Sequence, residues 1–156
     1  MKATQRLHDA GQSVLDRATL APATGAARGA SLLIEAGGGP LEVILIATGS
    51  EVSPALEAHQ RLAADGIRSR VVSMPSWELI DVQPQSYRDG VLPPKVQTRA
   101  NIEGAAPFRW DCYGGPGGAT IGVNRFGAPA PGPGVSRRFG FTADHVVETA
   151  QAVLAR

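Results

Sequence analysis

The feature that most constrains this chain is the uninterrupted apolar run Val43–Ala47, which a Thr-Gly-Ser turn and a helical pattern follow at once. A strand that is apolar on both faces belongs inside a sheet covered on both sides, as parallel sheets are. After the turn, apolar residues and one histidine recur at helical spacing: Val52, Ala55, Leu56, His59, Leu62 and Ala63. We expect Ser50 or Ser53 to cap the start of this helix and Gly66 to end it in a left-handed conformation. The pattern predicts a strand-helix unit of a parallel sheet.

The alternation of strand and helix patterns continues along the chain. The expected elements are an edge strand at 31–36, strands at 70–74, 96–103 and 119–123, one or two short helices within 76–90, and a last helix capped by Thr142. Residues 126–135 contain three prolines and three glycines, which predicts a loop. The order predicts an α/β three-layer sandwich around a mostly parallel five-stranded sheet with one antiparallel edge strand. We assign residues 30–156 to this domain and residues 1–29 to a linker or an incomplete lead-in.

Composition narrows the functional classes. The chain has 156 residues, enough for one hydrophobic core, and its net charge of +1 comes from scattered rather than clustered basic residues. Nucleic-acid binding needs a basic stripe, and the apolar runs are too short to cross a membrane. Cys112 is the only cysteine, which excludes an internal disulfide. The N-terminus does not resemble a secretory signal, so we expect a cytoplasmic protein without a nucleic-acid or membrane partner.

Several strings, taken in order, resemble the C-terminal domain of the transketolase family. Residues 43–52, VILIATGSEV, are similar to its opening strand, and residues 70–78, RVVSMPSWE, to its second-strand signature. Further matches are Tyr87-Arg88, Val91-Leu92-Pro93, Glu103, Phe108, Trp110-Asp111, Tyr113, Gly115, Gly118-Ala119, Ile121-Gly122, Arg125-Phe126-Gly127, Ala130-Pro131 and Phe139-Gly140-Phe141-Thr142. The pyruvate dehydrogenase and deoxyxylulose phosphate synthase families share the fold, but the string SMPSWE is closer to transketolase.

The resemblance implies a role within a larger enzyme. Transketolases move a two-carbon ketol unit between sugar phosphates in the pentose phosphate pathway, using thiamine diphosphate and magnesium or calcium. Their cofactor lies between two larger domains that precede the one seen here. The resemblance therefore implies no catalytic, cofactor-binding or metal-binding residue in this chain, which alone is predicted to be inactive. The implied partners are the remaining transketolase domains or a partner subunit, in a homodimer or another self-association.

One candidate site favours a different function. Thr48, Gly49 and Ser50 join the carboxyl end of a strand to the start of a helix, where doubly wound folds often bind anions. This position keeps an alternative open, a free-standing small α/β module that binds an anionic metabolite.

Candidate interface residues lie in the loops. Large aromatic side chains in loops commonly anchor interfaces, so we expect Phe108 and Trp110 to contact a neighbouring domain or a second subunit. Arg125 is a further candidate, as an interface or a solvated charge. Cys112 would need a nearby base to act as a nucleophile, and no histidine is close to it in sequence. We expect Cys112 to be a packed or half-exposed thiol, His59 to lie in a core or an interface, and His145 to face solvent.

Overall fold

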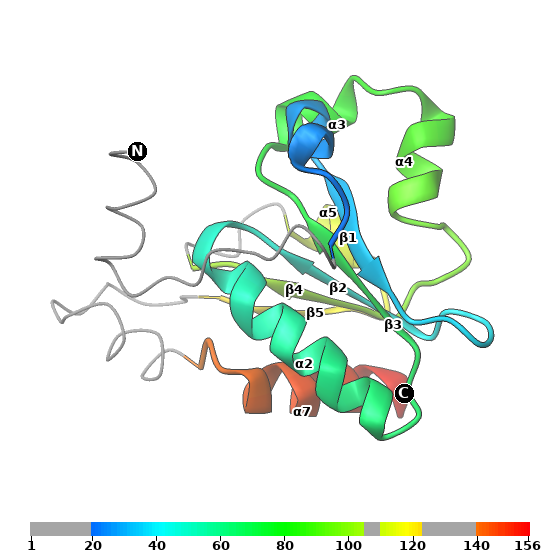
Figure 1. The fold of residues 1–156 in the computed structure, drawn as a ribbon, viewed down its shortest axis with the longest axis vertical. Coiled ribbons are helices and arrows are strands. Elements are labelled where there is room, and N and C mark those ends of the chain that lie inside the picture. The colour runs from blue at the N-terminus through cyan, green and yellow to red at the C-terminus, as the bar shows by residue number, and fades with distance from the viewer. Residues whose placement is uncertain (1–19, 105–109, 123–139) are drawn as a thin grey trace, which may run out of the picture.

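The structure, a computed structural model, describes residues 20–104, 110–122 and 140–156. Within these residues a five-stranded sheet lies between two layers of helices (Figure 1). The strands are β1 (Ser31–Glu35), β2 (Val43–Ala47), β3 (Ser69–Ser73), β4 (Arg99–Ile102) and β5 (Ala119–Ile121). Their order across the sheet is β1-β3-β2-β4-β5. The predicted α/β three-layer sandwich is confirmed.

The sheet is parallel except at one edge. Strands β3, β2, β4 and β5 run parallel to one another, and β1 runs antiparallel to β3. The β1–β3 register shifts by one residue between Leu32 and Ile34, a β-bulge of the kind found at sheet edges. The predicted antiparallel edge strand is therefore confirmed, together with the mostly parallel arrangement.

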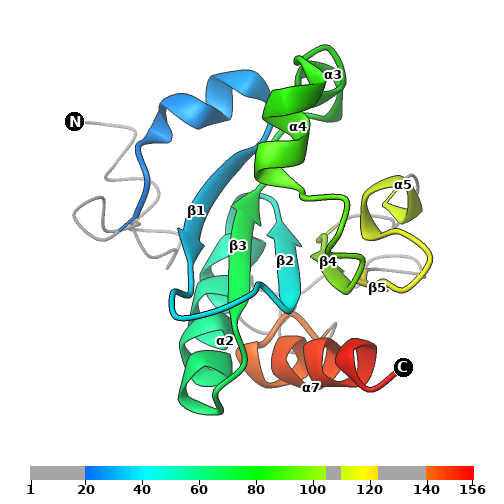
Figure 2. The same cartoon turned by 90° about the vertical axis from the view of Figure 1, so that its right-hand side faces the viewer.

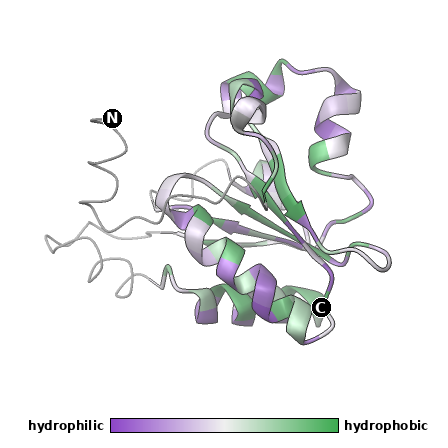
Figure 3. Cartoon of the chain, viewed as in Figure 1, coloured by the Kyte–Doolittle hydropathy of each residue, from purple (hydrophilic) through white to green (hydrophobic). Residues whose placement is uncertain are grey.

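One face of the sheet is covered by the two longest helices, α2 (Val52–Ala64) and α7 (Ala143–Leu154) (Figures 1 and 2). Hydrophilic and hydrophobic residues alternate along both helices, whereas the strands are mainly hydrophobic (Figure 3). The core on this side is formed by Leu33, Val43, Leu45, Ala47, Val52, Ala55, Ala58, Leu62, Val71, Ala100, Ile102, Ile121, Phe141, Ala143, Val146 and Ala150.

Among the described residues, no helix is both long and apolar enough to span a membrane.

The opposite face is covered by shorter elements: the 3-10 helix η1 (Ala23–Arg28), α3 (Trp77–Asp81), α4 (Gln85–Val91) and α5 (Asp111–Gly114) (Figure 2). Their core contains Ala30, Ile44, Ile46, Val72, Met74, Ile80, Val91 and Trp110. Successive side chains of a strand point to opposite faces. Val43, Leu45 and Ala47 accordingly enter the first core, while Ile44 and Ile46 enter the second. Every residue of β2 is buried, as its sequence predicted.

The helix that follows β2 starts differently from the sequence prediction. A 3-10 turn, η2 (Gly49–Glu51), leads directly into α2 at Val52, and neither Ser50 nor Ser53 caps the helix through its side chain. The predicted serine cap is therefore wrong. Pro54 lies in the first turn of α2, where a missing N–H costs no helix hydrogen bond. Gly66 ends the helix in a left-handed conformation, with φ of 78°, as predicted. Thr142 caps the last helix as predicted, because its hydroxyl accepts a hydrogen bond from the His145 N–H at 3.3 Å.

The chain before β1 is partly built into the fold. Ala21 donates its backbone N–H to the Leu33 carbonyl, and η1 packs against β1 and α3. Gly29 ends η1 with φ of 88° and donates to the Ala26 carbonyl at 3.1 Å. The predicted loop at 126–135 lies outside the described residues.

Candidate functional site

The turn Thr48-Gly49-Ser50 lies at the carboxyl edge of the parallel strands. It follows β2, whose neighbours β3 and β4 lie on opposite sides of it, so the turn sits where the strand order reverses. Open α/β sheets bind ligands outside this point. Thr48 is extended and Gly49 has a positive φ of 57°, which brings the chain round into η2.

A carboxylate of the chain occupies this position. Glu51 is only 9% exposed, and its Oε1 accepts a hydrogen bond from the Ser50 hydroxyl at 2.8 Å. The same oxygen lies against Gly104, just beyond β4, because a Cβ added at Gly104 would be 2.8 Å from it. A carboxylate near a helix N-terminus is favourable, and it repels a second anion. The geometry of Glu51 therefore argues against anion binding at Thr48, Gly49 and Ser50.

Trp110 is a core residue in the described structure. Its side chain is 0% exposed and packs edge-on to Trp77 and Tyr113, with ring centroids 5.5 Å and 6.3 Å away. A fully buried ring has no surface left for a partner, so the expectation that Trp110 anchors an interface is corrected here. Phe108 and Arg125, the other two candidates, lie outside the described residues.

The thiol and the histidines do not converge. Cys112 is exposed on α5, and His145 is exposed on α7, with its Nδ1 3.6 Å from Glu148. His59 is buried between α2 and the sheet, where its Nδ1 lies 2.7 Å from the Ser69 hydroxyl. No group of three or more histidine, cysteine, aspartate or glutamate side chains within the described residues could hold a metal ion.

The burial of His59 predicts a pH-dependent stability. Burial lowers the pKa of His59 below its ordinary value of 6.5, because the interior disfavours the charged ring. Below pH 6.5 the unfolded chain binds a proton that the folded chain resists, so stability should be complete above pH 6.5 and fall as the pH drops toward the folded pKa. Urea unfolding of the wild type and His59→Gln from pH 8 to 5.5 measures this. The wild type should lose stability relative to the variant, and parallel profiles would contradict the prediction.

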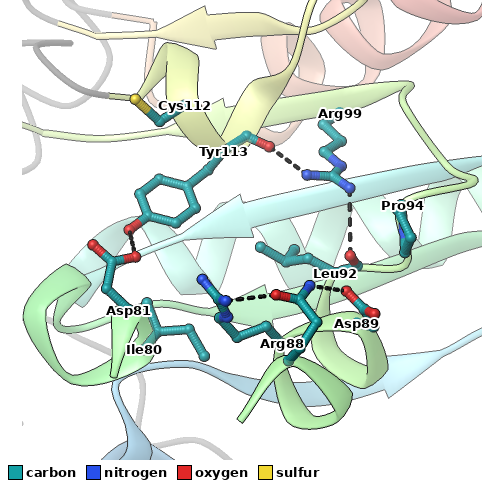
Figure 4. Close-up of a pocket in the computed structure, with 10 residues that line it drawn as sticks. Ile80, Asp81, Arg88, Asp89, Leu92, Pro94, Arg99, Cys112 and Tyr113 are labelled. Atoms are coloured by element: carbon teal, nitrogen blue, oxygen red, sulfur yellow. Dashed lines mark hydrogen bonds between the residues drawn. The ribbon is translucent and has the colours of Figure 1, made fainter. Parts of the chain in front are cut away.

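A polar pocket of about 400 Å³ opens beside the second helix layer (Figure 4). Its walls come from α3, α4, α5 and the segment that leads into β4: Ile80, Asp81, Gln85, Arg88, Asp89, Leu92, Pro94, Arg99, Cys112 and Tyr113. The Tyr113 hydroxyl donates to Asp81 at 2.8 Å, which links α5 to α3. No pattern in the sequence predicted this pocket, because its charged residues come from α3, α4 and β4 and meet only in the folded chain.

The described residues form a three-layer α/β domain. Within them no metal centre is found, and Cys112 on α5 is not close to the buried His59 on α2, which covers the other face of the sheet. A family model for the transketolase-like TK C-terminal domain matches residues 29–142. The chain belongs to the transketolase C-terminal domain family, which confirms the resemblance found in the sequence.

Individual relatives agree with this assignment. The chain is 46% identical over 132 residues to a transketolase from Geobacillus stearothermophilus, covering 85% of this chain and 20% of that protein. It is 44% identical over 128 residues to transketolase 1 from Escherichia coli, covering 82% and 19%. A solved transketolase from Leishmania mexicana superposes with a TM-score of 0.77 at 37% identity, covering 85% of this chain and 19% of that chain. This chain thus spans about a fifth of the length of these relatives.

Proposed function

We propose that this chain serves as the C-terminal structural and interface domain of a thiamine diphosphate-dependent transketolase and has no catalytic site of its own. The observation that carries the proposal is the extent of the match, which covers 85% of this chain but only 20% of the Geobacillus stearothermophilus transketolase. In this proposal residues 30–156 form the domain, residues 1–29 lead into it, and the assembly is a cytoplasmic homodimer.

The proposed parent reaction is ketol transfer between sugar phosphates. Transketolase structures from Pichia stipitis, matched at 34% identity, are complexes with xylulose 5-phosphate, sedoheptulose 7-phosphate and fructose 6-phosphate. We infer that thiamine diphosphate and magnesium or calcium are held by domains outside this chain. The role left to this chain is to support those domains.

Two observations support an interface role. Leu79 on α3 and Val82 just after it are large apolar residues with 44% and 76% of their surface exposed. In this proposal Leu79 and Val82 make the apolar contact with a neighbouring transketolase domain. Trp110 cannot make that contact, because it is fully buried. A split-gene transketolase whose β chains form an inactive tetramer matches 81% of this chain with a TM-score of 0.59 at 26% identity. In this proposal, that inactive tetramer supports both the inactivity of this chain alone and its self-association.

A domain exchange tests this proposal. Replacing the last fifth of the Geobacillus stearothermophilus transketolase with this chain should give an active dimer, whereas the same enzyme truncated before that segment should assemble poorly. This chain alone, with thiamine diphosphate and magnesium, should not turn over xylulose 5-phosphate and ribose 5-phosphate, and calorimetry should detect no thiamine diphosphate binding. Turnover by this chain alone, or a folded exchange enzyme that stays monomeric, would contradict the proposal.

A further inference from the structure

Two arginines in the pocket differ from the arginines that form ion pairs elsewhere in the described structure. Arg61, Arg68 and Arg70 each pair with at least one carboxylate. Arg88 and Arg99 are half-buried, have no carboxylate within ion-pair distance among the described residues, and line the same pocket. A buried charge without an opposite charge is costly. Both cations therefore favour an anion in the space between the pocket walls.

Arg99 is held in place by neutral groups only. Its guanidinium donates to the backbone carbonyls of Val96 and Pro93 at 2.9 and 3.0 Å. It also donates to the carbonyl of Tyr113 at 2.7 Å and more weakly to that of Leu92 at 3.4 Å (Figure 4). Carbonyl groups satisfy its N–H donors but leave its full charge in place. Burial also lowers the pKa of Arg99, because desolvation disfavours its charged form. Arg99 thus places a fixed positive charge on one part of the pocket wall, while Asp81 and Asp89 place negative charges elsewhere on the same wall.

Arg88 offers the free donor. Its Nη2 donates to Gln85 Oε1 at 2.5 Å, and Gln85 in turn donates to Asp89 at 2.6 Å, so the amide separates the cation from the carboxylate (Figure 4). The Arg88 Nε has no hydrogen-bond partner among the described residues but is buried, so a ligand in the pocket contacts the terminal Nη1 and Nη2, of which Nη1 makes no hydrogen bond to the described residues. A guanidinium edge of this kind fits a phosphate or carboxylate group with two parallel hydrogen bonds.

We propose that this pocket binds a small phosphate ester that carries hydroxyl groups, with its phosphate at Arg88 in the field of Arg99. The pocket volume of about 400 Å³ suits a small metabolite. Asp81 and Asp89 also line the pocket. Their carboxylates disfavour a second anionic group and accept hydrogen bonds from hydroxyl groups. The inference stands independently of the proposed role within transketolase, because it rests on this pocket alone.

Cys112 provides a way to observe the site. It is the only cysteine of the sequence, is exposed, and lines the pocket. The rate at which the neutral reagent 4,4′-dithiodipyridine modifies Cys112 in the full chain is measured with glycerol 3-phosphate, inorganic phosphate, succinate or glycerol at constant ionic strength. Calorimetry gives the dissociation constants in parallel. Glycerol 3-phosphate should slow the modification saturably and phosphate should do so more weakly, while glycerol should have no effect.

Variants decide whether the arginine carries the binding. Arg88→Gln should raise the dissociation constant for glycerol 3-phosphate by about tenfold or more, as the loss of a charge-assisted hydrogen bond predicts. Arg28→Gln is the matched control, because Arg28 is exposed and stacks on Tyr87 outside the pocket. If Arg88→Gln does not fold, Gln85→Glu replaces it, since a carboxylate there would pair with Arg88 and compete with the ligand.

The proposal is overturned by any of four results. They are the absence of saturable protection of Cys112, equal protection by glycerol, tighter binding of succinate than of glycerol 3-phosphate, and unchanged binding in Arg88→Gln or Gln85→Glu. The first of these includes calorimetric binding without an effect on Cys112, because that outcome would place the ligand elsewhere. Loss of binding in Arg88→Gln with retention in Arg28→Gln supports it.

Discussion

Replacing Trp110 with alanine should lower the free energy of unfolding by about 3–5 kcal/mol, the usual cost of truncating a buried tryptophan. The side chain is fully buried among Ile44, Ile46 and Met74 and lies edge-on to Trp77 and Tyr113. Its removal leaves a large cavity and two lost aromatic contacts, each worth about 0.5–1.5 kcal/mol beyond area burial. Small domains are stable by about 5–15 kcal/mol, so much of the total would be lost.

Urea unfolding followed by circular dichroism measures this loss, with Trp110→Phe as the control. The indole Nε1 is buried and has no hydrogen-bond partner among the described residues, so phenylalanine removes an unsatisfied donor while keeping most of the ring. The phenylalanine variant should therefore lose much less stability than the alanine variant. Sedimentation should show the same association state for the phenylalanine variant and the wild type. A stable alanine variant with weakened association would restore the interface interpretation.

The sequence predicted those parts of the fold that local signals determine. The uninterrupted apolar run of β2 indicated a strand covered on both faces, and its alternate residues do enter two separate cores. Gly66 follows the end of α2 with a positive φ, as predicted. Thr142 begins α7 with a hydroxyl that accepts a hydrogen bond from a backbone N–H, as predicted. These features depend on neighbours within a few residues, which is why they could be read without the structure.

The start of α2 shows where local rules gave the wrong answer. The two serines predicted a side-chain cap, but the chain forms the 3-10 turn η2 first, and the Ser50 hydroxyl donates to Glu51 instead. The reason lies in tertiary contacts, because the Glu51 carboxylate packs against Gly104 beyond β4. A neighbour more than fifty residues away was not visible in the serine pattern.

Side-chain direction was the other missing information. An aromatic residue in a loop can face a partner or turn inward, and only the positions of α3 and α5 show that Trp110 turns inward. The pocket needs the same information. Arg88 and Arg99 come from α4 and β4, and their lack of carboxylate partners is a property of the packed chain rather than of sequence spacing.

A second large effect is expected from Gly29→Ala, which should destabilise the domain by about 3 kcal/mol or more. Gly29 has a φ of 88°, and alanine in a left-handed conformation costs about 1–2 kcal/mol. A Cβ at this position would also lie within 3.0 Å of the Ile80 nitrogen, the Ser76 oxygen and the Leu79 carbonyl carbon. These are backbone atoms of α3 and its cap, which cannot rotate away, so overpacking adds about 1–3 kcal/mol.

The chain offers a matched control in Gly38→Ala. Gly38 has the same φ of 88°, but a Cβ there would meet no atom within 4 Å. Its replacement should cost only the backbone strain of about 1–2 kcal/mol. The difference between the two variants in thermal and urea unfolding therefore measures the close approach of Gly29 to α3. That approach is also held by the hydrogen bond from the Ser76 N–H to the Gly29 carbonyl at 3.1 Å, so η1 and α3 should loosen together. Equal losses of stability in the two variants would mean that Gly29 is required for its conformation alone and that α3 yields without cost.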